Sequence, residues 1–490
     1  MYNRTSTKEK WTIMKYIKDF DKMVIYADAV RKGFADISDD ALENIQNNMQ
    51  DLNIYRPRFS KPNYVTIRNK VNQIVFYMFG YKLRKGKEYK IVMSPLGNLL
   101  LDNRKNKEYV SRIFFTMLYS MEFSHPFNKM SDEFKLYPYR LIFQLLVDER
   151  LEGKLFHDEV FYYVMFIKEI NEEIYEKLIE DILAFRRLSP VEKYSLFKND
   201  EWVIANALHE WNYATGMLEQ SGIVRIKNDD NDENHGILVH GNNGSGRRKY
   251  KMNYITFIDE NMKNFAIKMA CKYNFSAQPL LGTDKYLRSE YISKMYTFYP
   301  KELIDELGLN SEEEEKIYSI LNITELIDKY ARNENNKTFN LFEDVLCDAF
   351  NLFSNVRAEK IAKAGTTDIE CMYYMNDSST KKFDVEAKAR KVKLMEISAG
   401  RLRAHRELIG SNYTIVVTPE YLPMVRQDIK GTETVILLSG TLSNFLYQYS
   451  VKYGRNIDYK VIDEIACRNM GKDITQQIND FISSNLGTSF

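Results

Sequence analysis

The segment Phe383–Lys388, with the sequence FDVEAK, constrains the fold of this chain more than any other stretch. In a β-strand, side chains alternate between two faces, so Asp384, Glu386 and Lys388 share one face and the apolar residues share the other. Burying three charged side chains on one strand is costly unless ions or opposite charges compensate them. The segment is therefore either a solvated ladder of charges on an exposed strand or part of a site that holds ions.

The elements around this strand predict an α/β core with a mixed sheet. Leu341–Phe353 carries the apolar stripe of an amphipathic helix, and Glu343 falls at the edge of that stripe. A Gly-Thr-Thr-Asp loop ends at Asp368 and leads, through a predicted strand at 369–374 and a polar turn, into FDVEAK. We therefore expect Asp368 and Glu386 to lie on adjacent strands of a hairpin.

A second group of polar residues follows the hairpin. Glu396–Leu408 has the pattern of a helix in which Arg401 and His405 lie four residues apart on one face. Two strands of the buried type, 413–418 and 434–438, complete the predicted core. A histidine in this position is more often a partly buried structural residue. His405 is therefore a candidate catalytic residue only in combination with the acids.

An acid followed by Glu-x-Lys across a hairpin is the layout required for metal-dependent phosphodiester hydrolysis. Asp368 and Glu386 would hold Mg²⁺ through hard oxygen ligands, and the ion would stabilise charge on the phosphate and polarise a water. Lys388 would orient or deprotonate that water. Glu-x-Lys by itself is common on exposed strands, so the hypothesis depends on the full arrangement of helix acid, loop acid, strand Glu-x-Lys and helical Arg and His.

The middle of the chain shows the order of elements of a winged helix. Two short helices, 202–207 and 212–221, precede strands at 223–227 and 250–257. The second helix is the candidate reader of a DNA major groove, and the loop between the strands ends in cations suited to phosphate contacts. The predicted DNA-binding residues are Asn212, Tyr213, Gln220, Arg247, Arg248, Lys249 and Lys251. The alternative is a solvated loop on a helical domain that does not bind DNA.

The composition limits the ways in which this protein could bind nucleic acid. The 490 residues include 69 Lys and Arg against 68 Asp and Glu, a net charge of +1. Overall basicity therefore cannot attract nucleic acid, and any contact with DNA must come from local patches. The four cysteines lack CxxC spacing, which indicates neither a zinc site nor a disulfide framework. The polar amino terminus and the lack of a long apolar stretch predict a cytoplasmic protein with no membrane partner.

Length and pattern together predict a multidomain α+β chain. Residues 1–150 look mostly helical, as in Tyr64–Tyr81, with a basic connector at 82–90 and a Pro-Leu-Gly turn within 91–101. Residues 151–300 contain the winged-helix pattern. A helical linker at 301–335 would join them to an α/β domain at 336–490.

At these residues the chain resembles the PD-(D/E)XK nuclease superfamily, and more narrowly the type IIS restriction endonucleases of the AlwI kind and the related nicking endonucleases. The matching residues, all within 341–438, are Glu343, Asp368, Glu386, Lys388, Glu396 and His405. The proline that usually precedes the first aspartate is Thr367 here. The resemblance implies Asp368 and Glu386 as metal ligands, joined by Glu343 as an accessory acid at the metal. It implies Lys388 and His405 as catalytic helpers and Glu396 as a supporting acid.

The resemblance also implies a helical and winged-helix recognition part, 1–300, and a PD-(D/E)XK cleavage domain, 336–490. The expected activity is Mg²⁺-dependent hydrolysis of double-stranded DNA a few base pairs outside a short asymmetric site, with Mn²⁺ as a substitute ion, in the cytoplasm of a prokaryote. One active site hydrolyses one strand, so duplex cleavage would need a homodimer through the cleavage domain or a second cleavage subunit.

Other readings of the same residues stay open. The chain could be a strand-specific nicking endonuclease or a subunit of a heterodimeric restriction enzyme. It could also be a repair nuclease without a fixed site. The alternative outside enzymes is a winged-helix DNA-binding regulator whose carboxy-terminal domain serves for dimerisation.

Overall fold

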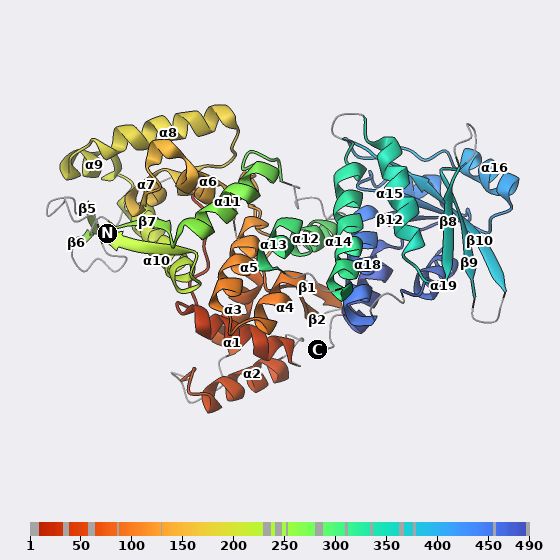
Figure 1. Ribbon diagram of the computed structural model, residues 1–490, viewed down its shortest axis with the longest axis horizontal. Helices are drawn as coiled ribbons and strands as arrows, with labels where there is room; N and C mark the ends of the chain where they lie inside the picture. Colours follow the sequence, from red (N-terminus) through yellow and green to blue (C-terminus); the bar gives the residue numbers. More distant parts are fainter. Residues whose placement is uncertain are drawn as a thin grey trace. The chain divides into compact units, whose positions relative to one another are not determined.

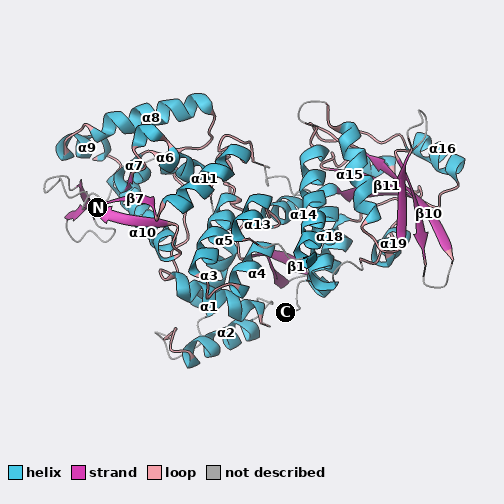
Figure 2. Ribbon diagram, viewed as in Figure 1, coloured by secondary structure: helices cyan, strands magenta, loops and turns pink. Residues whose placement is uncertain are grey.

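The computed structural model describes residues 9–32, 39–56, 64–85, 88–128, 130–228, 237–240, 247–250, 253–279, 288–308, 312–333, 337–361, 367–375, 379–453 and 457–486. The chain forms two compact units. The first comprises residues 1–81, 93–283 and 302–307, and the second comprises 82–92, 284–301 and 308–490. Figure 2 shows that helices dominate the first unit and that the largest sheet belongs to the second. No helix within these ranges is long and apolar enough to cross a membrane.

The chain up to residue 150 is mostly helical, as expected. Its helices are α1 (Phe20–Arg31), α2 (Asp39–Asp51), α3 (Tyr64–Phe76), α4 (Pro95–Asp102), α5 (Lys107–Tyr119) and α6 (Pro138–Val147). The predicted connector and Pro-Leu-Gly turn are wrong, because Gly80–Lys85 (β1) and Glu88–Met93 (β2) pair as strands and Pro95 begins α4. A Cβ at Gly97 would overlap the carbonyl oxygen of Phe79, so this helix packs closely only with glycine there.

The rest of the first unit surrounds a small sheet. Its elements are β3 (Leu155–Phe156), α7 (His157–Tyr162), α8 (Glu172–Arg186), α9 (Pro190–Phe197), α10 (Glu201–Gln220), β4 (Val224–Asn228), β5 (Ile237–His240), β6 (Arg247–Tyr250), β7 (Asn253–Phe257), α11 (Glu260–Lys272) and most of α13 (Lys301–Leu307), with 3₁₀ turns at Glu149–Leu151 and Val164–Phe166. The predicted antiparallel pairing of the strands that became β4 and β7 is confirmed. β3 pairs with β7, which gives the strand order β3-β7-β4.

Helix α10 differs from the two short helices that the sequence predicts. It runs unbroken from Glu201 to Gln220. Trp211 is buried, and the Glu210 carboxylate accepts hydrogen bonds from the backbone N–H of Ile13 at 3.0 Å and from Lys10 Nζ at 2.6 Å. These contacts with the amino-terminal segment hold residues 208–211 as helix interior, where the local pattern predicts a break.

The second unit contains a five-stranded mixed sheet with the strand order β12-β11-β10-β9-β8 (Figure 1). β10 runs antiparallel to β9 and parallel to β11, which confirms the predicted mixed core. The elements are α12 (Arg288–Tyr296), α14 (Glu312–Ala331), α15 (Phe339–Asn351), β8 (Val356–Lys360), β9 (Ile369–Tyr374), β10 (Thr380–Ala387), α16 (Ala399–Ile409), β11 (Thr414–Thr418), α17 (Val425–Asp428), β12 (Thr434–Leu438), α18 (Ser439–Tyr453), α19 (Lys460–Arg468), α20 (Thr475–Phe481) and a π-helical turn, Ile482–Leu486.

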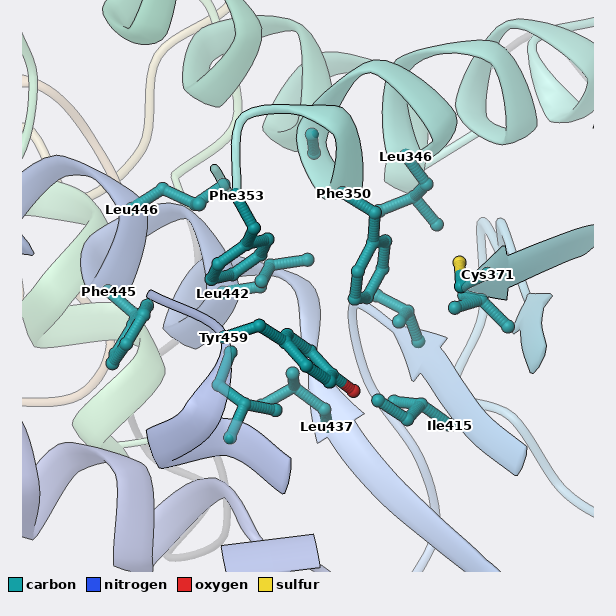
Figure 3. Close-up of a cluster of buried hydrophobic side chains, with 14 of the residues drawn as sticks. Leu346, Phe350, Phe353, Cys371, Ile415, Leu437, Leu442, Phe445, Leu446 and Tyr459 are labelled. Atoms are coloured by element: carbon teal, nitrogen blue, oxygen red, sulfur yellow. The ribbon is translucent and has the colours of Figure 1, made fainter. Parts of the chain in front are cut away.

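The two faces of this sheet have separate cores. One face packs against α14, α15 and α18–α20, and Figure 3 shows Tyr459 among the buried side chains of this cluster. The ring of Tyr459 also stacks on Phe383, with centroids 4.5 Å apart. Ile327 of α14 is fully buried in this cluster, so α14, which lies in the predicted linker, packs as part of the second unit. The other face carries a smaller cluster that includes Leu402 of α16 and Val416 of β11. Since side chains alternate along β10, Asp384 and Glu386 face this second side.

Candidate functional site

Asp368 and Glu386 lie side by side at the end of the β9–β10 hairpin. The register pairs Ile369 with Val385, so the next position outward sets Asp368 opposite Glu386. Asp368 Oδ2 accepts a hydrogen bond of 2.7 Å from the backbone N–H of Ala387, which fixes the loop acid against β10. The structure thus brings together the two acids that the sequence predicts on adjacent strands.

The two carboxylates lie in a buried, highly charged environment. Glu386 is only 2% exposed, and its Oε1 accepts hydrogen bonds from Lys388 Nζ at 2.5 Å and from Arg401 Nη2 at 2.6 Å. Its Oε2 is buried and has no hydrogen-bond partner within the described part of the chain. Burial, and then the charge of Glu386, raise the pKa of Asp368 to about 7. Both cations contact Oε1, so the buried Oε2 of Glu386 is left without a compensating partner among the described residues.

Glu343 approaches the same group from α15. The apolar stripe predicted for this helix is buried as expected, and the Glu343 side chain is 19% exposed at its edge. Its carboxylate pairs with Lys360 Nζ at 3.1 Å, and its charge contributes to the raised pKa of Asp368. Lys360 also binds Asp344 at 2.7 Å, so this lysine is held outside the Asp368–Glu386 pair.

A second buried acid, Asp384, supports the strand beneath the pair. Its carboxylate accepts hydrogen bonds from Thr367 Oγ1 at 3.1 Å, Ser411 Oγ at 2.5 Å and Thr414 Oγ1 at 3.2 Å. Burial raises the pKa of Asp384 to about 6, and the three hydroxyl donors oppose that rise. Sequence pattern alone missed these hydroxyls, because they come from three separate segments.

Of the polar residues predicted on the helix after the hairpin, Arg401 contacts Glu386, whereas Glu396 and His405 make no described bond to the two acids. α16 begins at Ala399, so Glu396 precedes it, lies exposed, and has no hydrogen bond or ion pair to Asp368 or Glu386 among the described contacts. Arg401 reaches Glu386 directly. His405, one turn later, is buried, and its Nδ1 has no hydrogen-bond partner in the described ranges. Leu408, the last residue of the predicted helix, is 68% exposed, so it is not part of the buried face that holds His405.

The donor set fits a divalent cation. Mg²⁺ takes oxygen ligands and is usually bound in proteins through one or two carboxylates, with water and substrate phosphate completing its shell. Asp368 and Glu386 offer two such carboxylates. The buried Oε2 of Glu386 has no hydrogen-bond partner among the described residues, so it could coordinate the ion. No group of three or more His, Cys, Asp and Glu residues that could hold a metal occurs among the residues that the structure describes.

Helix α10 presents a continuous accessible stripe. Trp202, Asn206, His209, Tyr213 and Gly216 follow each other at spacings of three and four residues, and each is at least partly exposed. None of these side chains is charged, and the rings of His209 and Tyr213 contact each other with centroids 5.3 Å apart. The sequence could have revealed this stripe only if 202–216 had been predicted as one helix, because its period runs across the expected break.

The other predicted DNA-binding residues have mixed placements. Gln220 Oε1 accepts a hydrogen bond of 2.8 Å from the backbone N–H of Phe20, and Asn212 hydrogen-bonds the buried His157, so both serve internal contacts. Tyr213 stays on the accessible stripe. Arg247, Arg248 and Lys249 lie on β6, paired with β5, where a loop end was expected. Lys251 lies outside the described residues.

Known proteins similar to this chain are restriction endonucleases. Residues 6–273 match the family described as type II restriction endonuclease HgaI, N-terminal domain. The chain is 37% identical over 487 residues to the type II restriction enzyme HgaI of Avibacterium volantium. This alignment covers 97% of this chain and 98% of the relative.

Two solved structures share a lower similarity. One is the BpuJ1 endonuclease binding domain in complex with modified DNA, at 14% identity over 60% of this chain and 98% of that chain, with a TM-score of 0.37. The other is the restriction endonuclease FokI, at 10% identity over 96% of this chain and 100% of that chain, with a TM-score of 0.27. Because the family match spans more than half of the chain and the relative aligns over nearly its whole length, the chain belongs to the HgaI family of type II restriction endonucleases.

Proposed function

We propose that this protein cuts double-stranded DNA as a type IIS enzyme, a few base pairs outside a short asymmetric site, with Mg²⁺ as its cofactor. Family membership makes it a site-specific DNA endonuclease, a phosphodiester hydrolase. The observation that carries the proposal is the pairing of Asp368 with Glu386 and Lys388 at one end of the β9–β10 hairpin. This is the grouping that the resemblance to the PD-(D/E)XK superfamily predicts.

Each of these side chains would have a role that follows from its position in the site. Asp368 and Glu386 would hold the cation, with Glu343 as the accessory acid at the edge. Bound there, Mg²⁺ supplies positive charge to the phosphate oxygens and acidifies water. Lys388, whose side chain is 19% exposed, is open enough to orient or deprotonate the attacking water from beside Glu386. His405 and Glu396 keep their predicted roles as catalytic helper and supporting acid.

The recognition part of the proposal rests on α10 and the β3-β7-β4 sheet. We keep the winged-helix prediction for this part. Its support is the antiparallel β4–β7 pair that follows α10 and the short strand β3 that pairs with β7. In such a module the accessible stripe of α10 would lie in the major groove. Its Asn206 and His209 side chains carry the hydrogen-bonding groups that read base edges, and Tyr213 would lie beside them. Arg247, Arg248 and Lys249 of β6 are the proposed phosphate contacts.

The narrower expectations also belong to this proposal. We place the enzyme in the prokaryotic cytoplasm. We keep the resemblance to the AlwI kind as a prediction, based on its matching residues Glu343, Asp368, Glu386, Lys388, Glu396 and His405. Mn²⁺ would substitute for Mg²⁺ because it accepts the same oxygen ligands. Duplex cleavage would use a second copy of the chain or a second cleavage subunit.

Substitution of the paired acids tests the site. Asp368→Ala and Glu386→Ala should each lower DNA cleavage by at least about 1,000-fold, because each removes a ligand of the catalytic ion. Binding to DNA that contains the recognised sequence, measured by gel shift, should stay within about threefold, since those contacts lie in the other unit. Glu359→Ala is the matched control, an exposed acid of the neighbouring strand β8, and should cut normally. Cleavage that survives either site substitution overturns the assignment.

A supercoiled plasmid separates this function from its alternatives. With Mg²⁺ the wild-type protein should give discrete linear fragments, and removal of the ion with EDTA should stop the reaction. Nicked circles as the sole product would identify a nicking enzyme. A smear would indicate a nuclease without a fixed site, and binding with no cleavage under any ion would indicate a regulator.

A further inference from the structure

We propose that Arg401 is a catalytic residue that binds a non-bridging oxygen of the scissile phosphate. This inference rests on the proposed function, because it takes the Asp368–Glu386 pair as the place where the phosphate is cut. Nothing in the sequence pattern gave Arg401 a role of its own. The structure assigns one through its contact with Glu386.

Arg401 reaches the site from its open side. Its Nη2 lies 2.6 Å from Glu386 Oε1, and the Glu386 side chain is 2% exposed while that of Arg401 is 52% exposed. The guanidinium therefore touches a buried carboxylate at one end and solvent at the other. The solvent-exposed end of this guanidinium is therefore available to a phosphate that binds at the carboxylate pair.

The Arg401 guanidinium has N–H donors beyond the one that bonds Glu386. A guanidinium carries five N–H donors in a planar fork that matches the oxygens of a phosphate. Within the described part of the chain, the hydrogen bond to Glu386 is the one side-chain contact that Arg401 makes. Arg401 can therefore keep its bond to Glu386 and still offer a pair of donors to a ligand.

Three lysines on β8 and β10 are already engaged by acids. Lys360 is held by Glu343 and Asp344, Lys382 pairs with Glu370, and Lys381 pairs with Asp463 at 2.7 Å. Lys388 is the group proposed to handle the water. A phosphodiester that enters a site with three nearby acids needs further positive charge, and Arg401 is the cation in position to provide it.

The backbone of α16 holds Arg401 in this position. Leu402 is buried in the core of this face, and Arg406 binds Glu433 at 2.6 Å and Thr414 at 3.3 Å. The helix is thus anchored to one face of the sheet through Leu402 and Arg406, while Arg401 contacts Glu386. A group held on a packed helix can stabilise charge without first reorganising.

The chemistry needs no change in Arg401 itself. During hydrolysis a bond forms between the water oxygen and phosphorus, and the bond from phosphorus to the leaving alcohol oxygen breaks. The water loses a proton to the general base, and the leaving oxygen gains one from solvent. Negative charge builds on the non-bridging oxygens in between, and Arg401 remains protonated and stabilises it through two N–H donors.

The test compares Arg401→Ala with Arg403→Ala in the full chain. Arg403 lies on the same helix, is 71% exposed and pairs with Glu407, so its loss should change cleavage less than about twofold. Under enzyme excess, Arg401→Ala should slow plasmid cleavage by about 100- to 1,000-fold while specific DNA binding without Mg²⁺ changes less than about threefold. Arg401→Lys should retain part of the activity, because it keeps a point charge but loses the fork.

Rescue by a small molecule separates catalysis from structure. Added guanidinium ion, at concentrations that leave wild-type activity unchanged, should raise the cleavage rate of Arg401→Ala about tenfold or more and leave Arg403→Ala unchanged. A thermal melt checks that Arg401→Ala is folded. Near-wild-type cleavage by Arg401→Ala, or a folded variant that guanidinium does not rescue, overturns the inference.

The outcomes for this proposal and for the function are distinct. If Asp368→Ala is inactive and Arg401→Ala is fully active, only the role of Arg401 fails. If Asp368→Ala cuts like wild type, the active-site assignment itself fails.

Discussion

Asp384 illustrates how this fold keeps an acid inside its sheet. The carboxylate is fully buried one position inward from Glu386 on the same strand face, and three hydroxyl groups donate to it. One of these donors belongs to Thr367, which stands where the superfamily usually has proline. Proline has no side-chain donor, whereas the threonine at this position supplies a hydroxyl that donates to the buried Asp384.

Thr367→Val should destabilise the protein in a pH-dependent way. Loss of the hydroxyl should raise the pKa of Asp384 above its value of about 6. A carboxyl whose pKa is raised in the folded state costs stability as the pH rises from its unfolded pKa, about 3.9, through its folded pKa. We expect a loss of about 1–3 kcal/mol in the free energy of unfolding at about pH 8, and less than half of it at about pH 5, where Asp384 is largely protonated. Thermal unfolding at the two pH values measures the difference.

Two further variants identify the cause of that loss. Thr367→Ser keeps the hydroxyl and should remain close to wild type. In an Asp384→Asn background the cost of Thr367→Val should shrink, since the carboxylate that needs the donor is gone. A cost that is the same at both pH values, or that is unchanged in this background, would contradict the role assigned to Thr367.

At the level of elements, the sequence predicts most where burial imposes a regular period. The stripe of α15 and the hairpin of β9 and β10 are confirmed, because each buries one face against a core and so shows its period in the residue pattern. The Asp368–Glu386 contact follows from that hairpin. The same reasoning could predict which strands are adjacent but not which hydroxyl or guanidinium comes from elsewhere to complete the site.

The errors occur where distant segments decide the structure. The unbroken α10 depends on Glu210 binding Ile13 and Lys10, almost two hundred residues earlier in the chain. The bond from the Phe20 backbone to Gln220, a predicted DNA-binding residue, and the contact of Arg401 with Glu386 also join separate segments, and the sequence pattern predicted neither. Such contacts are set by tertiary packing, so the local periodicity of the sequence cannot predict them.

The accessible stripe of α10 leads to a prediction about Gly216. A Cβ built at Gly216 meets no atom within 4 Å, so Gly216→Ala should fold normally and gain up to about 1 kcal/mol of helix stability. If this face lies in the major groove, the added methyl should weaken specific DNA binding by about tenfold or more. His209→Ala should do the same by removing a base contact worth about 1–3 kcal/mol. Gel shifts with specific and unrelated duplexes measure both effects.

The control for this face lies on another helix of the same unit. Asn264→Ala changes an exposed polar residue of α11 and should leave both stability and DNA affinity near wild type. Equal DNA affinity for wild type, Gly216→Ala and His209→Ala would show that α10 does not read DNA. Equal losses on specific and unrelated duplexes would show a contact without sequence discrimination.

For the whole molecule, the division into two units matters more than the net charge. The second unit takes in residues 82–92 and 284–301 as well as the carboxy-terminal part, so the chain passes between the units more than once. Binding and cleavage can then reside in different units without residing in separable halves of the sequence. Each chain still supplies a single Asp368–Glu386–Lys388 group, which is enough for one DNA strand at a time.

Mixing active and inactive chains should therefore change the products of cleavage. With a plasmid that carries one recognised site, about a tenfold excess of Asp368→Ala over wild type should pair most active chains with an inert partner. Such pairs cut one strand, so nicked circles should accumulate and the ratio of nicked to linear DNA should rise well above that of wild type alone. Competition for DNA slows both products equally and leaves this ratio unchanged, which makes the ratio the measurement. A constant ratio at every excess would mean that one chain cuts both strands in turn.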